Sequence, residues 1–434
     1  MRQDVGTCDR EHFARERIAI RWQIASDIAE SGAKKSMRLL VVMTNYPFPP
    51  RTGSAIVACN IMKHLSKNHE IDFVCIQPES GMVESAEYLN RLVLIPRRRP
   101  SKIALWIRCL LYMMMGVPPA VCEFASNTMS NAVTALIEVG QYNAILLFEL
   151  SALQYCPSSC YSKLIVHIED PQSIKLTRLM KLPDISLWQR FKYFLASRLT
   201  IRYEKKILPR AAKVLLLSES DLHDMQEQNG YHNLACVHYG VDPVDPGEIP
   251  GYEDRKRIIV FSGNMFHLPN VDGILYFLKD IFPLILQMYQ TAALWIVGAN
   301  PDNRIYDAAA NYGEQVVITG SVDDVAYYIK TATVSICPVR LKIGVQTKIM
   351  EALSLGTPVV TTSAGNNGVT GVSGCHLWVE DDPQQFAMRV LELLQGIGWS
   401  HLSRKGRTFV TEHYSWEGSV AQLEQHLEPW ISKH

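Results

Sequence analysis

Residues 338–369, PVRLKIGVQTKIMEALSLGTPVVTTSAGNNGV, decide how this chain is expected to fold. Gly344 predicts a turn that opens a helix, and Lys348 and Glu351 share one face of that helix because they are three residues apart. Gly356 is expected to end the helix, and the β-branched run at 358–362 predicts a buried strand. A glycine turn that opens a helix exposes N–H groups and the positive end of the helix dipole, which suits phosphate. Since Glu351 can accept hydrogen bonds from sugar hydroxyls, the segment favours a nucleotide-activated sugar.

Outside this segment, strand and helix patterns alternate in two successive halves of the 434-residue chain. This alternation predicts an α/β fold with two doubly wound parallel sheets, whose carboxyl-terminal strand ends face a cleft between the domains. A stretch rich in proline and glycine at 238–251 predicts a linker. We expect five parts: a helical extension at 1–36, a first Rossmann-like domain at 37–240, a linker at 241–256, a second Rossmann-like domain at 257–413, and a C-terminal helix at 414–434.

The net charge of zero conceals opposite charges in the two halves. Residues 1–210 carry 28 Lys and Arg against 18 Asp and Glu, whereas residues 211–434 carry 15 against 25. The excess of basic residues favours contact between the first half and an anionic surface or substrate, and solvated charges that segregate without a function are the alternative.

The ten cysteines show no metal-ligand spacing along the sequence. Most of them lie in apolar runs, where cysteine packs as a small hydrophobic side chain. Residues 1–36 are charged and lack the apolar core of a signal peptide. We therefore expect a cytoplasmic protein with reduced cysteines, and the ones in apolar runs are Cys59, Cys75, Cys109, Cys236 and Cys337.

Residues 103–121, IALWIRCLLYMMMGVPPAV, come closest to a membrane-spanning segment. Arg108 interrupts the run and Pro118 closes it, so it falls short of the roughly 18–20 apolar residues that span a bilayer. A basic cluster at 97–102 precedes it, as is typical of a helix that lies in a membrane interface, although a helix buried in the domain would have a similar sequence. The interfacial interpretation predicts docking at the inner face of the plasma membrane with the help of Lys175, Arg178, Lys181, Arg190 and Lys192.

Several motifs occur in an order similar to that of the retaining glycosyltransferases of the GT-B fold, particularly family four. The first half contains YPFPPRTGSA, VHIED, SES and YGVD, and the second contains FSGNMFHLPNVDG, WIVGANP, VVITGSVDDV and the segment quoted first. The patterns GNMxxxPN and GxQxKxxEA resemble those of a bacterial subgroup that builds exopolysaccharides and surface glycans. The resemblance covers residues 37–430, and it implies that the closing segment YSWEGSVAQLEQHLEPW forms a final helix that crosses back to the first domain. It implies a metal-independent hexosyltransferase that moves a sugar from a nucleotide-sugar donor to a glycan, lipid-linked or small-molecule acceptor, with retention of the anomeric configuration.

The resemblance places most of the donor site in the second domain. Glu351 matches a carboxylate that holds the nucleotide ribose, and Lys348 on the same helix face can neutralise charge on the leaving diphosphate. The further residues expected to bind the donor are Gly53, Gly263, Asn264, Gly298, Val322, Arg340, Gly344, Val345 and Gln346.

His167, at the end of a strand, matches the family's active-site histidine near the donor sugar. In a retaining transfer without a covalent intermediate, it is expected to orient and polarise the reactants rather than attack. Lys348 and Glu351 complete the expected catalytic set. Asp170 and Arg51 are expected on the acceptor side.

Two positions depart from the family's pattern. Ile343 stands where relatives carry the first carboxylate of an E-x7-E motif, and Asn264 stands where they carry an arginine of the diphosphate clamp, with His267 or Asn270 near the position of the clamp lysine. Lys348 and Arg340 are therefore expected to carry more of the diphosphate charge. The departures keep two alternatives open, a non-catalytic nucleotide- or glycan-binding protein and a sugar-nucleotide 2-epimerase.

No metal ion and no cofactor is expected, because the nucleotide sugar is a co-substrate. The pair Asp323 and Asp324 predicts a helix cap, and the pair Asp381 and Asp382 predicts a solvated turn, rather than metal ligands. The expected partners are a nucleotide-diphosphate sugar and a glycan or lipid-linked acceptor, with an anionic membrane surface as a further candidate. Nucleic acid is not expected.

Overall fold

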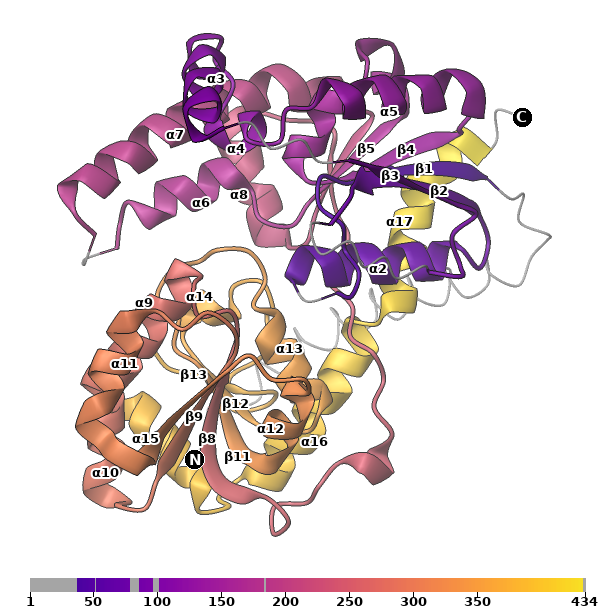
Figure 1. Cartoon of the computed structure of the whole chain (residues 1–434). Coiled ribbons are helices and arrows are strands. Elements are labelled where there is room, and N and C mark those ends of the chain that lie inside the picture. Colours follow the sequence, from indigo (N-terminus) through magenta and orange to yellow (C-terminus); the bar gives the residue numbers. More distant parts are fainter. Residues whose placement is uncertain (1–36, 51, 79–85, 97–100, 183–184, 432–434) are drawn as a thin grey trace.

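The computed structural model describes residues 37–431 apart from 51, 79–85, 97–100 and 183–184. Two parallel sheets, each flanked by helices, form two domains (Figure 1). This arrangement confirms the expected α/β, doubly wound fold class. The predicted extension at 1–36, its helix at 11–30, and Arg51 lie outside the described residues.

The first sheet has the strand order β3-β2-β1-β4-β5-β6-β7, and all its neighbouring strands are parallel. The order changes direction between β1 and β4, where an open α/β sheet binds its ligands. Every residue of β4 and β5 is buried, as expected for central strands covered on both faces. The strands are β1 (Arg38–Val42), β2 (Glu70–Ile76), β3 (Arg91–Ile95), β4 (Ala144–Phe148), β5 (Leu164–Ile168), β6 (Lys213–Leu216) and β7 (Leu234–Cys236).

The second sheet repeats the design with the order β10-β9-β8-β11-β12-β13, again parallel throughout. Its direction changes between β8 and β11, so the segment quoted first follows a central strand. The strands are β8 (Lys256–Ser262), β9 (Ala293–Val297), β10 (Val316–Gly320), β11 (Ala332–Cys337), β12 (Val359–Thr361) and β13 (Trp378–Val379).

Helices cover both faces of each sheet (Figure 1). The first domain contains α2 (Gly53–Leu65), α3 (Lys102–Met114), α4 (Pro119–Cys122), α5 (Asn127–Gly140), α6 (Gln172–Leu179), α7 (Leu187–Ile207) and α8 (Glu219–Asn229). The second contains α9 (Leu268–Tyr276), α10 (Phe282–Met288), α11 (Asn303–Ala309), α12 (Val325–Thr331), α13 (Thr347–Ser354), α14 (Ser363–Asn366), α15 (Pro383–Leu394) and α16 (Trp399–His413). The last helix is α17 (Trp416–Ile431).

Some elements differ from the sequence expectation. Residues 271–288, whose apolar pattern predicts one helix, belong to α9 and α10 joined by a π-helical turn at Phe277–Ile281, because Pro283 lacks the N–H that would continue the regular hydrogen bonds. The sequence patterns do not predict β3 and β7, which form the two edges of the first sheet; β3 is mostly half-buried, and β7 is only three residues long. Asp382 caps α15 rather than lying in a plain solvated turn, whereas Asp324 caps α12 as expected.

The C-terminal helix α17 returns to the first domain and packs against α2 (Figure 1). His64 of α2 lies 3.0 Å from a carboxylate oxygen of Glu417, and His69 lies 3.2 Å from one of Glu424. Trp416 is buried at the start of the helix and its ring lies 5.0 Å from that of Tyr239 in the linker. The last helix therefore ties the two domains together through the linker.

Helix α3 contradicts the interpretation that it is buried in the domain. None of its residues is buried, and its Trp106 is 68% exposed. Cys109 is joined to Cys122 of α4 by a disulfide, so the prediction of a free, buried Cys109 is wrong. Among the described residues, no helix combines the length and the apolar character that crossing a bilayer requires.

Candidate active site

The carboxyl ends of β4 and β5 place three titratable side chains together in the first domain. His167 pairs with Phe148 in the sheet register, and their rings lie 5.3 Å apart. His167 is 2% exposed, and its Nε2 has no hydrogen-bond partner. Because burial disfavours the charged imidazolium, it lowers the pKa of His167 to about 4, so this ring is neutral at physiological pH.

Glu169 directly follows β5, at the carboxyl edge of the sheet. Burial, with a smaller contribution from the charge of Asp170, raises the pKa of the Glu169 carboxyl. Asp170 itself accepts a hydrogen bond from Lys175 at 3.1 Å. The two neighbouring carboxyl groups therefore differ in environment, because Asp170 is paired with a lysine and Glu169 is buried.

Glu149 is a site residue that the sequence predictions missed. It follows β4, lines the same cavity as His167 and Glu169, and has a backbone φ of 138°. Such a φ is strained for a residue with a side chain, and strain of this kind concentrates at functional sites. Burial raises the pKa of the Glu149 carboxyl, which accepts a hydrogen bond from Ser151 at 3.1 Å. The detectable signal was one acidic residue inside the apolar run AILLFELSALQY.

Two glycines let backbone approach these carboxylates closely. A β-carbon on Gly53, the first residue of α2, would lie 2.2 Å from Oε1 of Glu169. A β-carbon on Gly344 would lie 1.8 Å from Oδ1 of Asp170, and Gly344 also has a positive φ of 53°. Since Gly344 belongs to the second domain, the predicted phosphate loop meets the acidic edge of the first domain directly. Thr52, where relatives have a second glycine, caps α2 by accepting a hydrogen bond from the N–H of Ala55.

The carboxyl ends of β8 and β9 form a backbone shelf in the second domain. A β-carbon on Gly298 would lie 1.8 Å from the carbonyl oxygen of Gly263, so only glycine fits there. The N–H of Gly263 donates to the carbonyl of Val297, and the N–H of Gly298 donates to that of Gly320. Val322, in the loop that follows β10, is half-buried.

Lys348 lies on α13, the helix that follows β11, and its side chain lies beside this backbone shelf. Its Nζ donates a hydrogen bond to Oδ1 of Asn270 at 2.6 Å and lies 4.3 Å from the ring centre of Phe261. Asn270 in turn donates to the carbonyl of Asn264, and a β-carbon on Gly263 would lie 3.1 Å from Nζ. Burial lowers the pKa of Lys348, since the charged ammonium loses water. This hydrogen bond therefore joins the motif GNMxxxPN, which contains Asn270, to the motif GxQxKxxEA, which contains Lys348.

Glu351 lies on the same helix and is half-buried. Burial raises the pKa of its carboxyl, and the charge of Lys348 acts in the opposite direction. The preceding loop places Gly344 in buried surroundings, while Val345 and Gln346 are half-buried and Gln346 donates to the carbonyl of Ile343 at 3.1 Å. The helix itself begins at Thr347, so the expected turn lies just before its first residue.

His267 shows how close the two halves of the site lie. Its pKa is lowered first by burial, then by the charge of Lys175 from the first domain, whereas Asp170 raises it and Lys348 lowers it. One imidazole therefore lies within electrostatic reach of charged groups from both domains.

Arg340 and Ile343 make contacts that the sequence did not predict. The guanidinium of Arg340 makes a two-pronged ion pair with Asp272 of α9, at 2.9 and 2.5 Å, and stacks over Tyr276. Ile343 is buried in an apolar cluster with Leu179 and Leu182 of the first domain. The residue that replaces the family's carboxylate thus forms an apolar contact between the domains, rather than leaving a gap in the polar site.

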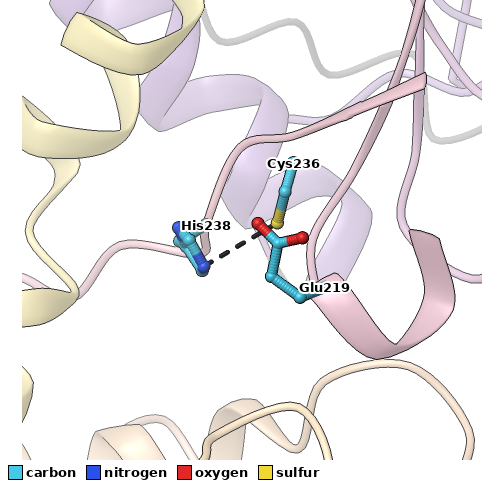
Figure 2. Close-up of side chains that lie close together, drawn as sticks. All are labelled: Glu219, Cys236 and His238. Carbon is cyan, nitrogen blue, oxygen red and sulfur yellow. Dashed lines mark hydrogen bonds between the residues drawn. The ribbon is translucent and has the colours of Figure 1, made fainter. Parts of the chain in front are cut away.

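The fold also assembles a group of potential metal ligands that spacing along the sequence did not indicate. Ligand atoms of Glu219, Cys236 and His238 all lie within 4.8 Å of one another (Figure 2). Sγ of Cys236 and Nε2 of His238 are 3.7 Å apart, and Nδ1 of His238 faces Oε1 of Gln422 at 3.3 Å. Since that amide oxygen only accepts, a proton on Nδ1 would leave Nε2, which faces Cys236, as the nitrogen that could bind a cation. Cys236 is therefore half-buried beside polar groups, which corrects its expected place in an apolar core.

Residues 256–396 match the family model described as Glycosyl transferases group 1. The matched residues make up most of the second domain. The chain is also 21% identical over 394 residues to an uncharacterised 44.6 kDa protein from the cps region of Klebsiella pneumoniae, a match that covers 87% of this chain and 96% of that protein.

Solved structures extend the similarity to both domains. Sucrose-phosphate synthase from Thermosynechococcus elongatus matches with a TM-score of 0.68 and 14% identity, over 92% of this chain and all of that chain. Anabaena HepE in complex with UDP and glucose matches with a TM-score of 0.62 and 12% identity, over 90% of this chain and 99% of that one. The part of the chain that the structure describes has the GT-B fold.

Proposed function

We propose that this GT-B protein transfers a sugar from a nucleotide-diphosphate donor to an acceptor hydroxyl, with retention of the anomeric configuration. The observation that carries the proposal is the close approach of Gly344, in the second domain, to Asp170 in the first. The charges of Asp170 and Lys348 both act on His267, so charged groups from both domains lie near one another. The group 1 domain and the UDP held by HepE support a nucleotide-sugar donor. The protein from the cps region supports a place in surface-glycan synthesis.

The second domain supplies the donor side. Lys348 is positioned by Asn270 to meet the diphosphate, and pairing with phosphate would restore the charge that burial disfavours. The N–H groups of the loop at 344–346 face the same charge, and Glu351 accepts hydrogen bonds from the ribose. Asn270 of α9 holds the ammonium group of Lys348, which comes from α13. Lys348 would therefore take over the role of the basic residues that form the diphosphate clamp in relatives.

The transfer needs no separate base. The bond between the anomeric carbon and the phosphate oxygen breaks, and its electron pair leaves with the nucleotide diphosphate. The acceptor oxygen bonds to the anomeric carbon on the same face, and its proton passes to the departing phosphate oxygen. A neutral His167 suits the role of orienting the sugar, since its free Nε2 can accept or donate a hydrogen bond without adding charge.

The test is release of nucleotide from a panel of UDP-, GDP- and dTDP-sugars by the full-length protein. We expect one donor class to be consumed, and Lys348→Ala to abolish most of the turnover while nucleotide binding persists. Binding without turnover for every donor would instead favour the non-catalytic alternative. Conversion of one nucleotide sugar into another without an acceptor would favour the 2-epimerase.

We further propose that the first domain docks on an anionic membrane from the cytoplasmic side. Side chains of α3 and α7 expose large apolar groups, including Trp106 and Trp188 at 68% and 63%. Of the predicted basic residues, Lys181, Arg190 and Lys192 are exposed. Lys175 and Arg178 are not available as expected, since Lys175 pairs with Asp170, and Arg178 contacts Asp224 and the carbonyl of Lys342.

Vesicle co-sedimentation tests the docking. We expect binding to vesicles that contain phosphatidylglycerol, a loss at high salt, and an approximately tenfold weaker affinity for Trp106→Glu and Trp188→Glu. Met388→Glu, at an exposed methionine of the second domain, is the matched control and should bind normally. Equal binding of all variants would refute the assignment of this surface.

A further inference from the structure

The first domain contains a cavity of about 720 Å³ that begins at the acidic edge of its sheet. Glu149, His167, Glu169 and Asp170 line one part of it. Ligand sites in proteins commonly enclose roughly 300–1,000 Å³, so the space suits a substrate rather than a few waters. The cavity belongs to the domain opposite the group 1 domain, which is the side where the acceptor has to bind.

Away from the carboxylates, the wall of this cavity is apolar. Its members come from α3, α4 and α7 and from the loops beside them, and include Met113, Pro118, Val121, Phe124, Leu195 and Leu199. A soluble glycan in this space would lose hydrogen bonds to water without gaining partners, which costs free energy for each hydroxyl. A hydrocarbon chain would instead gain about 25 cal/mol for each Å² removed from water.

The cavity also reaches the same two helices that expose apolar side chains to the outside. Met113 of α3 and Leu195 of α7 line it, while Trp106 and Trp188 project from these helices into solvent. The disulfide from α3 to α4 holds the helix against this side of the cavity, and α3, α4 and α7 form one rim of the domain in Figure 1. The same two helices therefore present apolar side chains both to the outside and to the cavity, which suits a hydrocarbon chain that enters the cavity from a bilayer.

Two lysines line the cavity between these regions. Lys175 of α6 pairs with Asp170 near the acidic edge, and Lys192 lies on α7 with its Nζ 5.3 Å from the ring centre of Trp188. The lining thus combines acids, a cation and an apolar wall, which are the groups that suit a sugar, a phosphate and a hydrocarbon chain of one molecule. The ammonium group of Lys192 is a suitable partner for the phosphate, whereas that of Lys175 already pairs with Asp170.

We infer that the acceptor is a lipid-linked saccharide, in which a sugar is joined through phosphate to a long hydrocarbon chain, and that this chain occupies the cavity between α4 and α7. The inference rests on the proposed glycosyl transfer, because the sugar end has to reach His167 and the carboxylates. It selects one acceptor class among the glycan, lipid-linked and small-molecule acceptors that the sequence left open.

A photoreactive benzophenone derivative of farnesyl phosphate, added to the full-length protein, tests the occupant. We expect crosslinks at residues 113–124 and 192–199, and competition by excess farnesyl phosphate but not by inorganic phosphate or a methyl glycoside. Ala196→Trp, which fills the cavity from α7, should reduce crosslinking about tenfold. Val139→Trp, at an exposed valine of α5 outside the cavity, should leave crosslinking unchanged.

Nucleotide binding of the same variants separates this inference from the proposed transfer. We expect Ala196→Trp to bind the donor nucleotide as the wild type does, because it lies outside the second domain. Leu199→Asp, which puts a charge into the apolar wall, provides a second variant if Ala196→Trp fails to fold. Crosslinks spread over the outer faces of α3 and α7, or equal labelling of Ala196→Trp and wild type, would overturn the inference. Absence of nucleotide binding by the wild type would overturn the proposed transfer instead.

Discussion

The two edges that face the cleft differ in how their polar groups are satisfied. On the second domain, Lys348 is hydrogen-bonded to Asn270 and Arg340 is paired with Asp272. On the first domain, Nε2 of His167 has no partner, and burial raises the pKa of Glu149 and Glu169. The donor edge is thus preorganised by paired cations, whereas the acceptor edge keeps an unpaired imidazole nitrogen for a bound sugar. Both edges contain groups whose charge burial disfavours, since burial also lowers the pKa of Lys348.

The largest expected effect is on the preorganised edge. Lys348→Ala should lower kcat about 10²–10³-fold, because the charge that stabilises the leaving diphosphate disappears. Lys342→Ala, at an exposed lysine of the same loop, is the control and should retain kcat. Steady-state kinetics with the donor found in the panel provides the measurement. Similar kcat values for both variants would show that Lys348 does not stabilise the leaving diphosphate.

Next in size is the apolar contact that joins the two edges. Ile343→Ala should lower the free energy of unfolding by about 2–4 kcal/mol, since it opens a cavity in the cluster with Leu179 and Leu182. Ile397→Ala, at an exposed isoleucine, should change little. Chemical denaturation followed by tryptophan fluorescence measures both. A negligible loss for Ile343→Ala would mean that this contact does not hold the domains together.

The acidic edge predicts a characteristic pH dependence. The pKa of Glu169 is raised on folding, so the native state binds more protons than the unfolded state, and the free energy of unfolding should fall as pH rises above the usual range of a glutamate. Glu169→Gln removes this contribution, and the wild type should lose stability relative to it by up to about 1.4 kcal/mol per pH unit.

Denaturation curves across the pH range provide the readout for this third prediction. Glu253→Gln, at a carboxylate whose side chain is 86% exposed, should follow the wild type. Parallel curves for Glu169→Gln and wild type would show that folding does not raise the pKa of Glu169. The acidic edge would then no longer differ from the donor edge in this respect.

The smallest effect is expected at Arg340. Its pairing with Asp272 predicts that Arg340→Ala and Asp272→Asn each lower Tm by about 2–4 °C, because each breaks the same ion pair. The nucleotide Kd should change less than about threefold, since that corresponds to well under 1.4 kcal/mol. Calorimetry of both variants measures the two quantities. A large loss of nucleotide affinity for Arg340→Ala alone would restore its predicted role in donor binding.

Much of the fold was predictable because central parallel strands are buried on both faces and therefore read as short β-branched or apolar runs. β4, β5, β8 and β9 follow this rule, and Gly356 ends α13 as expected with a φ of 67°. The edge strands β3 and β7 escaped detection because they are short, with five and three residues, and a short apolar run does not distinguish a strand from a loop or helix segment. For the site, motifs predicted Lys348 and His167, but Glu149 escaped because a single acid in an apolar run has no periodicity.

The sequence alone determined which residues could bind phosphate and sugar, since glycine turns, strand ends and helix faces are set by local chemistry. Only the tertiary structure decided which groups meet. It joined Lys348 to Asn270, placed Ile343 in an apolar contact between domains, and gathered Glu219 with Cys236 and His238. It also extended the acidic edge into an apolar cavity that reaches α3 and α7. These outcomes depend on distances between segments far apart in the chain, and a local sequence pattern does not encode such distances.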